Sequence, residues 1–349
     1  MKEMKAAVKV DQEKRLVVKN VPMPVPKPHE ALVKITAIGL CGSDLAIKNN
    51  TFMGRHGPVE LPIIPGHEFC GEVIELGSQC RKVKVGQRVV TSCIVGCGEC
   101  YHCRVGIINR CRDWDHIGID SQGCFAEYIA IDENILFEVP DYIPDVEAAI
   151  LEPATTGARA IRTNEITPGS FIAMFGPGPF GQFIMQNMAA TSPSRLVMVG
   201  LSSDKERLEL AKQLGATDVI MADLEDPVQK INEMTGGHGA DVVVEATGDV
   251  NAVTQALEVA AGGALVLMGG SGFGGKSVSF EPWNVVRDEK RLKGLQGFTW
   301  GDYLLACELY KAGRLQIKPI ITKTMPLDEV NEACKLVETK QAMKIVLIP

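Results

Sequence analysis

The feature that most constrains the fold of this chain is a regular alternation of strand-like and helix-like segments over residues 171–268. Short apolar runs are each followed by a longer stretch with apolar residues at helical spacing. The expected strands are 171–175, 196–199, 218–222, 241–245 and 264–268, and the expected helices are 180–190, 205–214, 226–234 and 250–260. Strands that are joined through helices run parallel, so the pattern predicts a doubly wound α/β domain.

The segments on either side of this alternation have a different character. Residues 1–150 contain short Val- and Ile-rich runs punctuated by Gly and Pro, which predict a β-rich domain. Beyond about residue 298 a helical stretch leads into a strand–helix–strand tail. A chain of 349 residues is long enough for about two domains. We therefore expect one domain of residues 1–155 with 298–349, and a second of residues 156–297 inserted in it.

The first expected strand of the alternation runs into a glycine-rich turn. Residues 176–181 read Gly-Pro-Gly-Pro-Phe-Gly, a G-x-G-x-x-G pattern between strand and helix. Gly176 permits the tight turn, Gly178 lets a pyrophosphate approach the backbone, and Gly181 allows the helix to pack closely on the strand. The helix N-terminus offers free N–H groups to the anion. The pattern predicts a dinucleotide site that also includes Pro179 and Phe180.

Two more turns end expected strands of this domain. Thr247 lies in Glu-Ala-Thr-Gly after the fourth strand, and Gly269 follows the fifth. Both lie at the carboxyl edge, where a cofactor rests in doubly wound sheets. We expect them to border the cofactor, although simple turns would fit the same residues.

The choice between NAD and NADP stays open at this point. An acidic residue about 20 positions beyond the glycines usually accepts a hydrogen bond from the ribose 2′-hydroxyl of NAD. Ser202 and Ser203 occupy that region, and Lys205 and Arg207 follow, a combination that would admit the 2′-phosphate of NADP. Asp204 could instead turn back toward a ribose, and the two basic residues fit ordinary helix-surface charges equally well.

Four cysteines are spaced C-x2-C-x2-C-x7-C at Cys97, Cys100, Cys103 and Cys111. Four thiolates this close in sequence can converge on one tetrahedral ion, so the spacing predicts a closed, structural zinc site in a lobe of residues 93–115. An iron–sulfur cluster fits less well because arginine, not proline, follows the last cysteine. Unmetallated thiols are a further alternative. Six other cysteines are expected to be small buried hydrophobes: Cys70, Cys80, Cys93, Cys124, Cys307 and Cys334.

A second set of possible metal donors is scattered along the chain. His67 and Glu68 follow a Pro-Gly pair, Cys41 opens the segment Cys-Gly-Ser-Asp, and Glu152 precedes Pro153. One thiolate, one imidazole and one or two carboxylates suit a zinc ion that keeps a position open for water or substrate. Spacing alone does not bring such distant residues together, and an isolated histidine is more often an ordinary core or surface residue.

At these residues the chain resembles the zinc-dependent medium-chain dehydrogenase/reductase superfamily, which includes the alcohol dehydrogenases, along essentially its whole length. The shared motifs are C-G-S-D at 41–44, G-H-E at 66–68, the four-cysteine lobe, E-P at 152–153 and G-x-G-x-x-G at 176–181. Gly-Cys-Phe-Ala-Glu-Tyr at 123–128 and the glutamate before Pro153 resemble the sorbitol and threonine dehydrogenase branch. The resemblance implies an α/β fold with a GroES-like β-rich catalytic domain plus a doubly wound Rossmann domain.

The resemblance also implies roles at the open metal site. Cys41, His67 and Glu152 would bind a catalytic zinc, and Glu68 would be a further ligand or a neighbour that exchanges with water. Ser43 would hydrogen-bond the substrate oxygen. Asp44 would orient the imidazole from behind.

One position departs from the pattern of the family. Many relatives have a histidine five residues after the first cysteine ligand, where it feeds a proton relay, but Ala46 stands there in this chain. A relay from Ser43 would then run through cofactor ribose hydroxyls, through His56 or through water.

The implied activity is hydride transfer between a secondary alcohol, a polyol such as sorbitol or L-iditol, and NAD or NADP, with two zinc ions per chain. Threonine, a sugar phosphate or a vicinal diol such as butanediol are alternative substrates for the same chemistry. Arg287 could bind a phosphate or carboxylate, although a plain surface charge fits slightly better. A non-catalytic zinc- and cofactor-binding protein is disfavoured because nothing structural requires an open zinc site. The resemblance implies a homodimer or homotetramer.

Charge and hydropathy exclude other classes of partner. The net charge is −7 and no basic stripe is present, which argues against nucleic acid. No apolar run reaches the ~18 residues of a membrane span. The first ten residues have no signal-type apolar run, and clustered cysteines in a reducing compartment indicate metal rather than disulfides. We therefore expect a cytoplasmic protein that acts on small-molecule alcohols and ketones.

Overall fold

The computed structural model describes residues 2–54, 57–270, 272–273 and 275–349, which divide into two compact units. The first contains Met1–Glu152, Gly297–Tyr303 and Ile320–Pro349, and the second contains Pro153–Gln296 and Leu304–Pro319. Residues 304–319, which we expected in the first domain, pack within the second unit. In chain order, both segments of the second unit lie between segments of the first.

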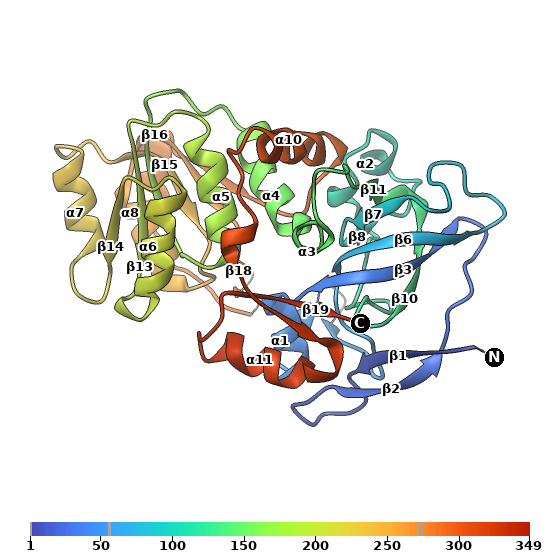
Figure 1. Ribbon diagram of the computed structural model, residues 1–349. Coiled ribbons are helices and arrows are strands. Elements are labelled where there is room, and N and C mark those ends of the chain that lie inside the picture. The colour runs from blue at the N-terminus through green and yellow to red at the C-terminus, as the bar shows by residue number, and fades with distance from the viewer. Residues whose placement is uncertain (1, 55–56, 271, 274) are drawn as a thin grey trace. The chain divides into compact units, whose positions relative to one another are not determined.

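The first unit is β-rich, as predicted. Its strands are β1 (Glu3–Val8), β2 (Val17–Pro22), β3 (Glu30–Gly39), β4 (Met53–Gly54), β5 (Gly57–Pro58), β6 (Glu68–Leu76), β7 (Arg88–Thr91), β8 (Ile94–Val95), β9 (Asp115–His116), β10 (Tyr128–Asp132), β11 (Leu136–Glu138), β18 (Ile321–Pro326) and β19 (Lys344–Ile348). In the described residues, the largest sheet has seven strands in the order β11-β7-β6-β3-β19-β18, with β10 also paired to β3. Figure 1 shows the C-terminal strand β19, in red, beside the blue strand β3.

Apolar side chains from several of these strands form the core of the first unit. Val33 of β3, Phe69 of β6 and Leu347 of β19 are almost fully buried in one cluster. Because these strands lie far apart in sequence, the core depends on strand pairing between the beginning and the end of the chain. The helices of this unit are α1 (Gly42–Lys48), α2 (Tyr101–Arg104), α3 (Asp145–Ala148) and α11 (Val330–Glu338).

The second unit has the predicted doubly wound sheet. Its strands are β12 (Phe171–Phe175), β13 (Arg195–Gly200), β14 (Asp218–Met221), β15 (Ala240–Glu245), β16 (Ala260–Met268) and β17 (Arg291–Gly294). Within the described chain they form one parallel sheet in the order β14-β13-β12-β15-β16-β17, so the direction of winding reverses between β12 and β15. The edge strand β17 was not predicted, because its sequence Arg-Leu-Lys-Gly carries two charges and has little strand character.

The predicted helices of the alternation are also present. They are α5 (Pro179–Ala189), α6 (Lys205–Leu214), α7 (Pro227–Met234) and α8 (Val250–Val259). Helices α5 and α6 pack together, and so do α7 and α8. The remaining helices are α4 (Leu151–Arg162), α9 (Pro282–Arg287) and α10 (Trp300–Lys311). Among the described residues, none of the helices combines the length and the apolar character that a membrane span requires.

Glu133 shows how a buried carboxylate fixes a loop of the first unit. Its side chain accepts hydrogen bonds from the backbone N–H groups of Arg81 and Lys82 at 2.6–2.9 Å, and the residue is 6% exposed. Glu133→Ala leaves these N–H groups without an acceptor, so we expect the free energy of unfolding to fall by about 1–3 kcal/mol. Urea unfolding measures the loss. Glu133→Gln keeps an acceptor and should lose less; equal losses would contradict this explanation.

Candidate functional site

The register of two neighbouring strands builds the candidate metal centre. β3 and β6 are antiparallel, and Gly39 pairs with Glu68. Cys41 follows the end of β3, and His67 immediately precedes β6, so this pairing brings their side chains together. The donor atoms of Cys41, His67 and Glu68 all lie within 4.8 Å of one another. Residue 39 must be glycine because a Cβ there would overlap the Glu68 carboxylate.

The other residues predicted for this site lie around the three donors. Glu152, in the first turn of α4, is not within the compact group, but it contributes to the potential that sets the pKa of His67. Ser43 lies in the first turn of α1, and its Oγ is buried with no hydrogen-bond partner among the described residues. Asp44 accepts a hydrogen bond from the backbone N–H of Cys41 at 2.9 Å. His56 lies outside the described residues.

The electrostatics of this site suit a cation. Burial lowers the pKa of His67, but Cys41, Asp44 and Glu152 outweigh burial and raise that pKa to about 10. Burial raises the pKa of Asp44 to about 6 and raises the pKa of Glu152 as well. The negative potential that holds a proton on the imidazole also attracts a metal ion. A thiolate, an imidazole and carboxylates in this arrangement fit zinc with an open position.

Lys344 is a site residue that sequence reasoning missed. Its Nζ lies 2.8 Å from Oε1 and 2.6 Å from Oε2 of Glu68, and both side chains are buried. Burial lowers the pKa of Lys344, but the nearby Glu68 and Cys41 raise it overall, so the ammonium is charged. The signal was a single charged residue at the start of an otherwise apolar strand, Lys-Ile-Val-Leu-Ile. The buried ion pair compensates a carboxylate that would otherwise be costly to bury.

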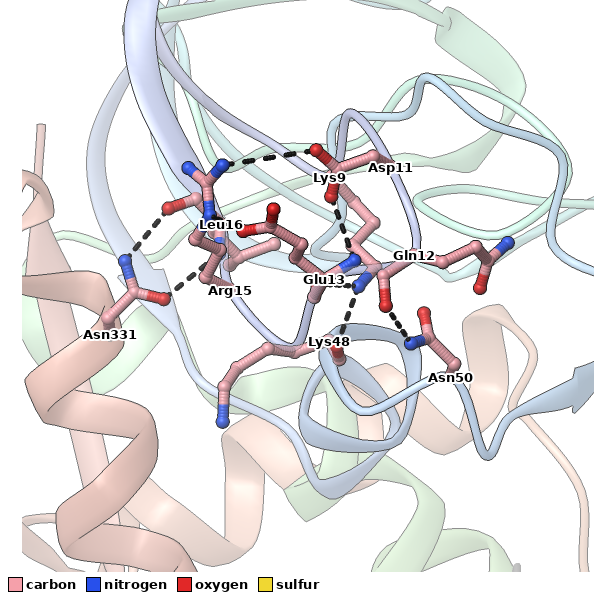
Figure 2. A network of polar contacts seen from close by, with 9 residues as sticks. All are labelled: Lys9, Asp11, Gln12, Glu13, Arg15, Leu16, Lys48, Asn50 and Asn331. Carbon is pink, nitrogen blue, oxygen red and sulfur yellow. Dashed lines mark hydrogen bonds and ion pairs between the residues drawn. The ribbon is translucent and has the colours of Figure 1, made fainter.

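A polar network fixes the far end of helix α1 (Figure 2). The buried ammonium of Lys9 donates to the carbonyl oxygen of Lys48, the last residue of α1, at 2.8 Å, and it also donates to the carbonyl oxygen of Glu13. The Asn331 side chain of α11 exchanges two hydrogen bonds with the backbone of Leu16, at 2.8 and 2.9 Å. Loop 9–16 is therefore bound to both helices, which holds the helix that follows Cys41.

The four-cysteine lobe has the geometry of a closed metal site. The donor atoms of Cys97, Cys100, Cys103 and Cys111 lie within 4.8 Å of one another. Sγ of Cys97 is 4.0 Å from that of Cys103, and Sγ of Cys100 is 3.9 Å from that of Cys111. Tetrahedral zinc with Zn–S bonds of about 2.3 Å places its sulfurs about 3.8 Å apart. The four sulfurs therefore fit one zinc ion and leave no position for a substrate.

The six remaining cysteines outside the two metal clusters are buried, as predicted. They are Cys70, Cys80, Cys93, Cys124, Cys307 and Cys334. Burial raises the pKa of the Cys93 and Cys124 thiols well above their usual value, which fits residues that pack as neutral side chains.

The predicted glycine turn lies between β12 and α5 in the second unit. Gly176 has a φ of +105°, and a Cβ there would lie 2.9 Å from the side chain of Thr247, so glycine is needed. Gly178 is the N-cap of α5, Pro179 is its first residue, and Gly181 lies one turn further along. No described atom lies within 4 Å of the place that a Cβ of Gly178 would take. The helix N-terminus is thus open to a pyrophosphate.

The other cofactor residues predicted at the sheet edge lie beside this turn. Glu245 ends β15 and accepts hydrogen bonds from the backbone N–H groups of Thr247 and Gly248 at 2.6 and 3.0 Å. The N–H of Gly269 donates to the carbonyl of Glu245 at 2.8 Å, and the position of a Gly269 Cβ lies 2.9 Å from the ring of Phe180. The structure therefore brings the glycine turn and the ends of β15 and β16 together.

The residues that bear on the choice between NAD and NADP follow β13 in the sequence. Ser202 and Ser203 belong to a 3₁₀ turn, Ser202–Asp204, that leads into α6. Asp204 is buried and lies 3.8 Å from Arg207, Oδ1 to Nη1. Lys205 lies 4.0 Å from Glu209, Nζ to Oε1. Arg207 and Lys205 therefore each have a carboxylate neighbour three or four residues away in the sequence.

Known proteins share both parts of this architecture. Residues 27–141 match the family model of the alcohol dehydrogenase GroES-like domain, and residues 185–312 match that of the zinc-binding dehydrogenases. The chain is 33% identical to L-threonine 3-dehydrogenase of Bacillus licheniformis and 30% identical to sorbitol dehydrogenase of Halalkalibacterium halodurans, each over 99% of both chains. A solved zinc-binding dehydrogenase of Sinorhizobium meliloti, bound to NADP, is 29% identical with a TM-score of 0.90 over 100% of both chains.

Removing one donor from each cysteine-containing cluster should separate their roles. We expect two zinc ions per chain by elemental analysis, one for each cluster. Cys103→Ser should lose one ion and lower the thermal midpoint, because a closed zinc site contributes folding energy. Cys41→Ser should also lose one ion, but it should keep a midpoint near that of the wild type and still bind reduced cofactor while turnover disappears.

The control is Cys80→Ser, which alters a buried cysteine whose Sγ lies 3.3 Å from the carbonyl oxygen of Glu30. A serine there keeps a donor, so both ions and the activity should remain. Full turnover by Cys41→Ser after metal depletion would show that the open cluster is not the reaction centre.

Proposed function

The chain belongs to the zinc-dependent alcohol dehydrogenase family of medium-chain dehydrogenases and uses NAD(P), and we propose that it oxidises a secondary hydroxyl group of a polyol or vicinal diol. The observation that carries the proposal is the buried cluster of Cys41, His67 and Glu68 with the unpartnered hydroxyl of Ser43 beside it, among the residues that the structure describes. A structural metal site would not need a free hydroxyl next to an incomplete donor set.

We assign the catalytic zinc to Cys41, His67 and Glu152, with Glu68 as a fourth donor or a neighbour that exchanges with water. Both Glu68 oxygens contact Lys344, which supports the exchanging role because the ion pair holds the carboxylate when it is not a ligand. When bound, zinc lowers the pKa of an alcohol hydroxyl and polarises a carbonyl, and NAD(P) supplies the hydride chemistry. The protein supplies the positions of these groups.

Ser43 is the residue that we expect to handle the substrate proton. A serine hydroxyl can donate one hydrogen bond and accept two, so Oγ can bind the substrate oxygen and receive its proton while it passes its own hydroxyl proton on. Asp44 keeps the start of α1 in place through its hydrogen bond to the N–H of Cys41. Since Ala46 has no titratable side chain, the onward route of the proton from Ser43 would use His56, water or the ribose hydroxyls of a bound cofactor.

Arg287 binds the residue that follows it: its Nε and Nη2 donate to the carboxylate of Asp288 at 2.8 and 3.2 Å, which agrees with the plain surface charge that the sequence slightly favoured. The sorbitol dehydrogenase relative, which is named for a polyol, supports a polyol substrate. The threonine dehydrogenase relative keeps a threonine substrate as the second candidate.

We also propose a homodimer or homotetramer in a reducing compartment, the cytoplasm. β17 is an edge strand of the described sheet, and helix α9 exposes Trp283 and Val286, apolar surface that association would cover. No disulfide joins the cysteines of the described residues, which is typical of proteins in a reducing environment.

A substrate panel followed by the absorbance of the reduced cofactor tests the proposal. Sorbitol, L-iditol, butanediol, L-threonine and a sugar phosphate would each be assayed with NAD and with NADP. We expect kcat/KM for a polyol or diol to exceed that for L-threonine by about tenfold or more, because the carboxylate of threonine needs a cation and the Lys344 ammonium at the metal centre is already paired with Glu68. A clear preference for L-threonine would replace the proposed substrate, and no oxidation of any of them would refute the activity.

Ser43→Ala tests the proposed proton path. We expect kcat to fall by about 10²–10⁴-fold, because the substrate proton loses its acceptor. Zinc content and cofactor affinity should stay unchanged, since Ser43 binds neither. Ser43→Thr keeps the hydroxyl and should retain most of the activity. If Ser43→Ala turns over at the wild-type rate, the substrate proton takes another route.

A further inference from the structure

A carboxylate reaches the end of β13 from the neighbouring strand. Asp223 follows β14, which pairs with β13 so that Gly200 lies opposite Met221. Its Oδ1 accepts a hydrogen bond from the backbone N–H of Ser202 at 2.7 Å, and its Oδ2 accepts one from Ser202 Oγ at 2.5 Å. Both carboxylate oxygens of Asp223 are therefore bound to one serine, at the position where an NAD-binding domain usually has an acid.

This pairing fixes what the Ser202 hydroxyl can offer to a ligand. A serine hydroxyl has one proton and two lone pairs. Because the proton is donated to Asp223, Oγ presents only lone pairs outward. A ribose 2′-hydroxyl can donate its proton to such an acceptor. A 2′-phosphate is an acceptor only and carries a charge of about −1.5 to −2 near neutral pH, so it finds no donor at Ser202 Oγ.

The charges around the turn do not offset this bias. Arg207 faces Asp204, and Lys205 faces Glu209. A cavity of about 550 Å³ beside Asp223 is also lined by Glu225, Asp226 and Glu258. A phosphate at Ser202 would therefore lie close to Asp223, on a loop that carries further carboxylates.

The two residues next to this pair provide apolar surface. Leu201 precedes Ser202 and Leu224 follows Asp223, and they are 46% and 72% exposed. Exposed leucines beside a hydroxyl acceptor suit a nucleoside, whose base is flat and largely apolar and whose ribose carries hydroxyl donors.

We infer that Asp223 makes this site selective for NAD over NADP, acting through the hydroxyl of Ser202. The inference rests on the proposed function, since it applies only if the chain uses a nicotinamide dinucleotide. Asp223 is a positioning residue: it orients Ser202, which touches the ribose. In the sequence, Ser202 and Ser203 are followed by two basic residues, a pattern that suggested room for a phosphate. The acid that binds Ser202 could not be recognised there, because it lies 21 residues further on, after the neighbouring strand β14.

Direct titration of NADH and NADPH into the purified full chain, followed by the fluorescence of the bound nicotinamide, tests the inference. We expect the Kd of NADPH to exceed that of NADH by about tenfold or more. Asp223→Asn keeps an oxygen that can accept from Ser202 and adds an N–H donor. It should lower the Kd of NADPH by about tenfold and change that of NADH by less than about threefold.

The matched control is Glu225→Gln, which removes the same charge from the same loop and lies beside Lys230 rather than Ser202. Its ratio of NADPH Kd to NADH Kd should change by less than about threefold, because Glu225 adds only to the general potential and does not bind Ser202. Ser202→Ala gives an independent measurement. Loss of the acceptor should raise the Kd of NADH by about threefold or more and so lower the ratio of NADPH Kd to NADH Kd.

The possible outcomes distinguish a failure of NAD selectivity from a failure of the dehydrogenase function. Equal or tighter binding of NADPH by the wild type overturns the inference, and so does an equal change of the ratio by Asp223→Asn and Glu225→Gln. Wild-type selectivity for NADH with a ratio unchanged in both Asp223→Asn and Ser202→Ala also overturns it. If the wild type binds neither cofactor, the proposed dehydrogenase function fails, and the inference fails with it.

Discussion

The pairing of Gly39 with Glu68 across β3 and β6 is the constraint on which the metal centre depends. It places Cys41 and His67, which follow one strand and precede the other, within reach of a single ion. It also forces a carboxylate into the space beside a glycine, where burial is costly without a cation. Lys344 supplies that cation from β19, which pairs with β3 through Val346 and Gly39. The strand order β6-β3-β19 therefore brings together both the donor residues and the cation that compensates Glu68.

Much of the second unit could be predicted from sequence because its information is local. Periodicity marked β12 to β16 and the helices between them, and the glycine pattern marked the turn before α5. β17 was missed because its two charges hide an edge strand. The cysteine lobe was equally local, since its four sulfurs lie within fifteen residues of sequence, Cys97 to Cys111.

The residues that escaped prediction share a physical cause. Lys344 lies 276 residues from Glu68, and Asp223 lies 21 residues from Ser202. Lys344 neutralises a group on β6, two strands away in the same sheet, and Asp223 orients a residue that follows the adjacent strand β13. Which strands come close is decided by sheet pairing rather than by neighbouring sequence. The candidate ligands Cys41, His67 and Glu152 were proposed through resemblance, because nothing in the spacing of Cys41 and His67 shows that β3 and β6 will pair in the register that brings these two together.

The place of β19 in the chain has a consequence for biosynthesis. The ribosome makes Cys41, His67 and Glu68 early, and it makes Lys344 only after the whole second unit. The strands of the doubly wound sheet lie in one continuous stretch, β12 to β17, so that unit can close its sheet while translation proceeds. Until β19 emerges and pairs with β3, Glu68 has no buried cation beside it. We therefore expect the buried charges of the metal centre to reach their final balance only after the C-terminal strand has been synthesised.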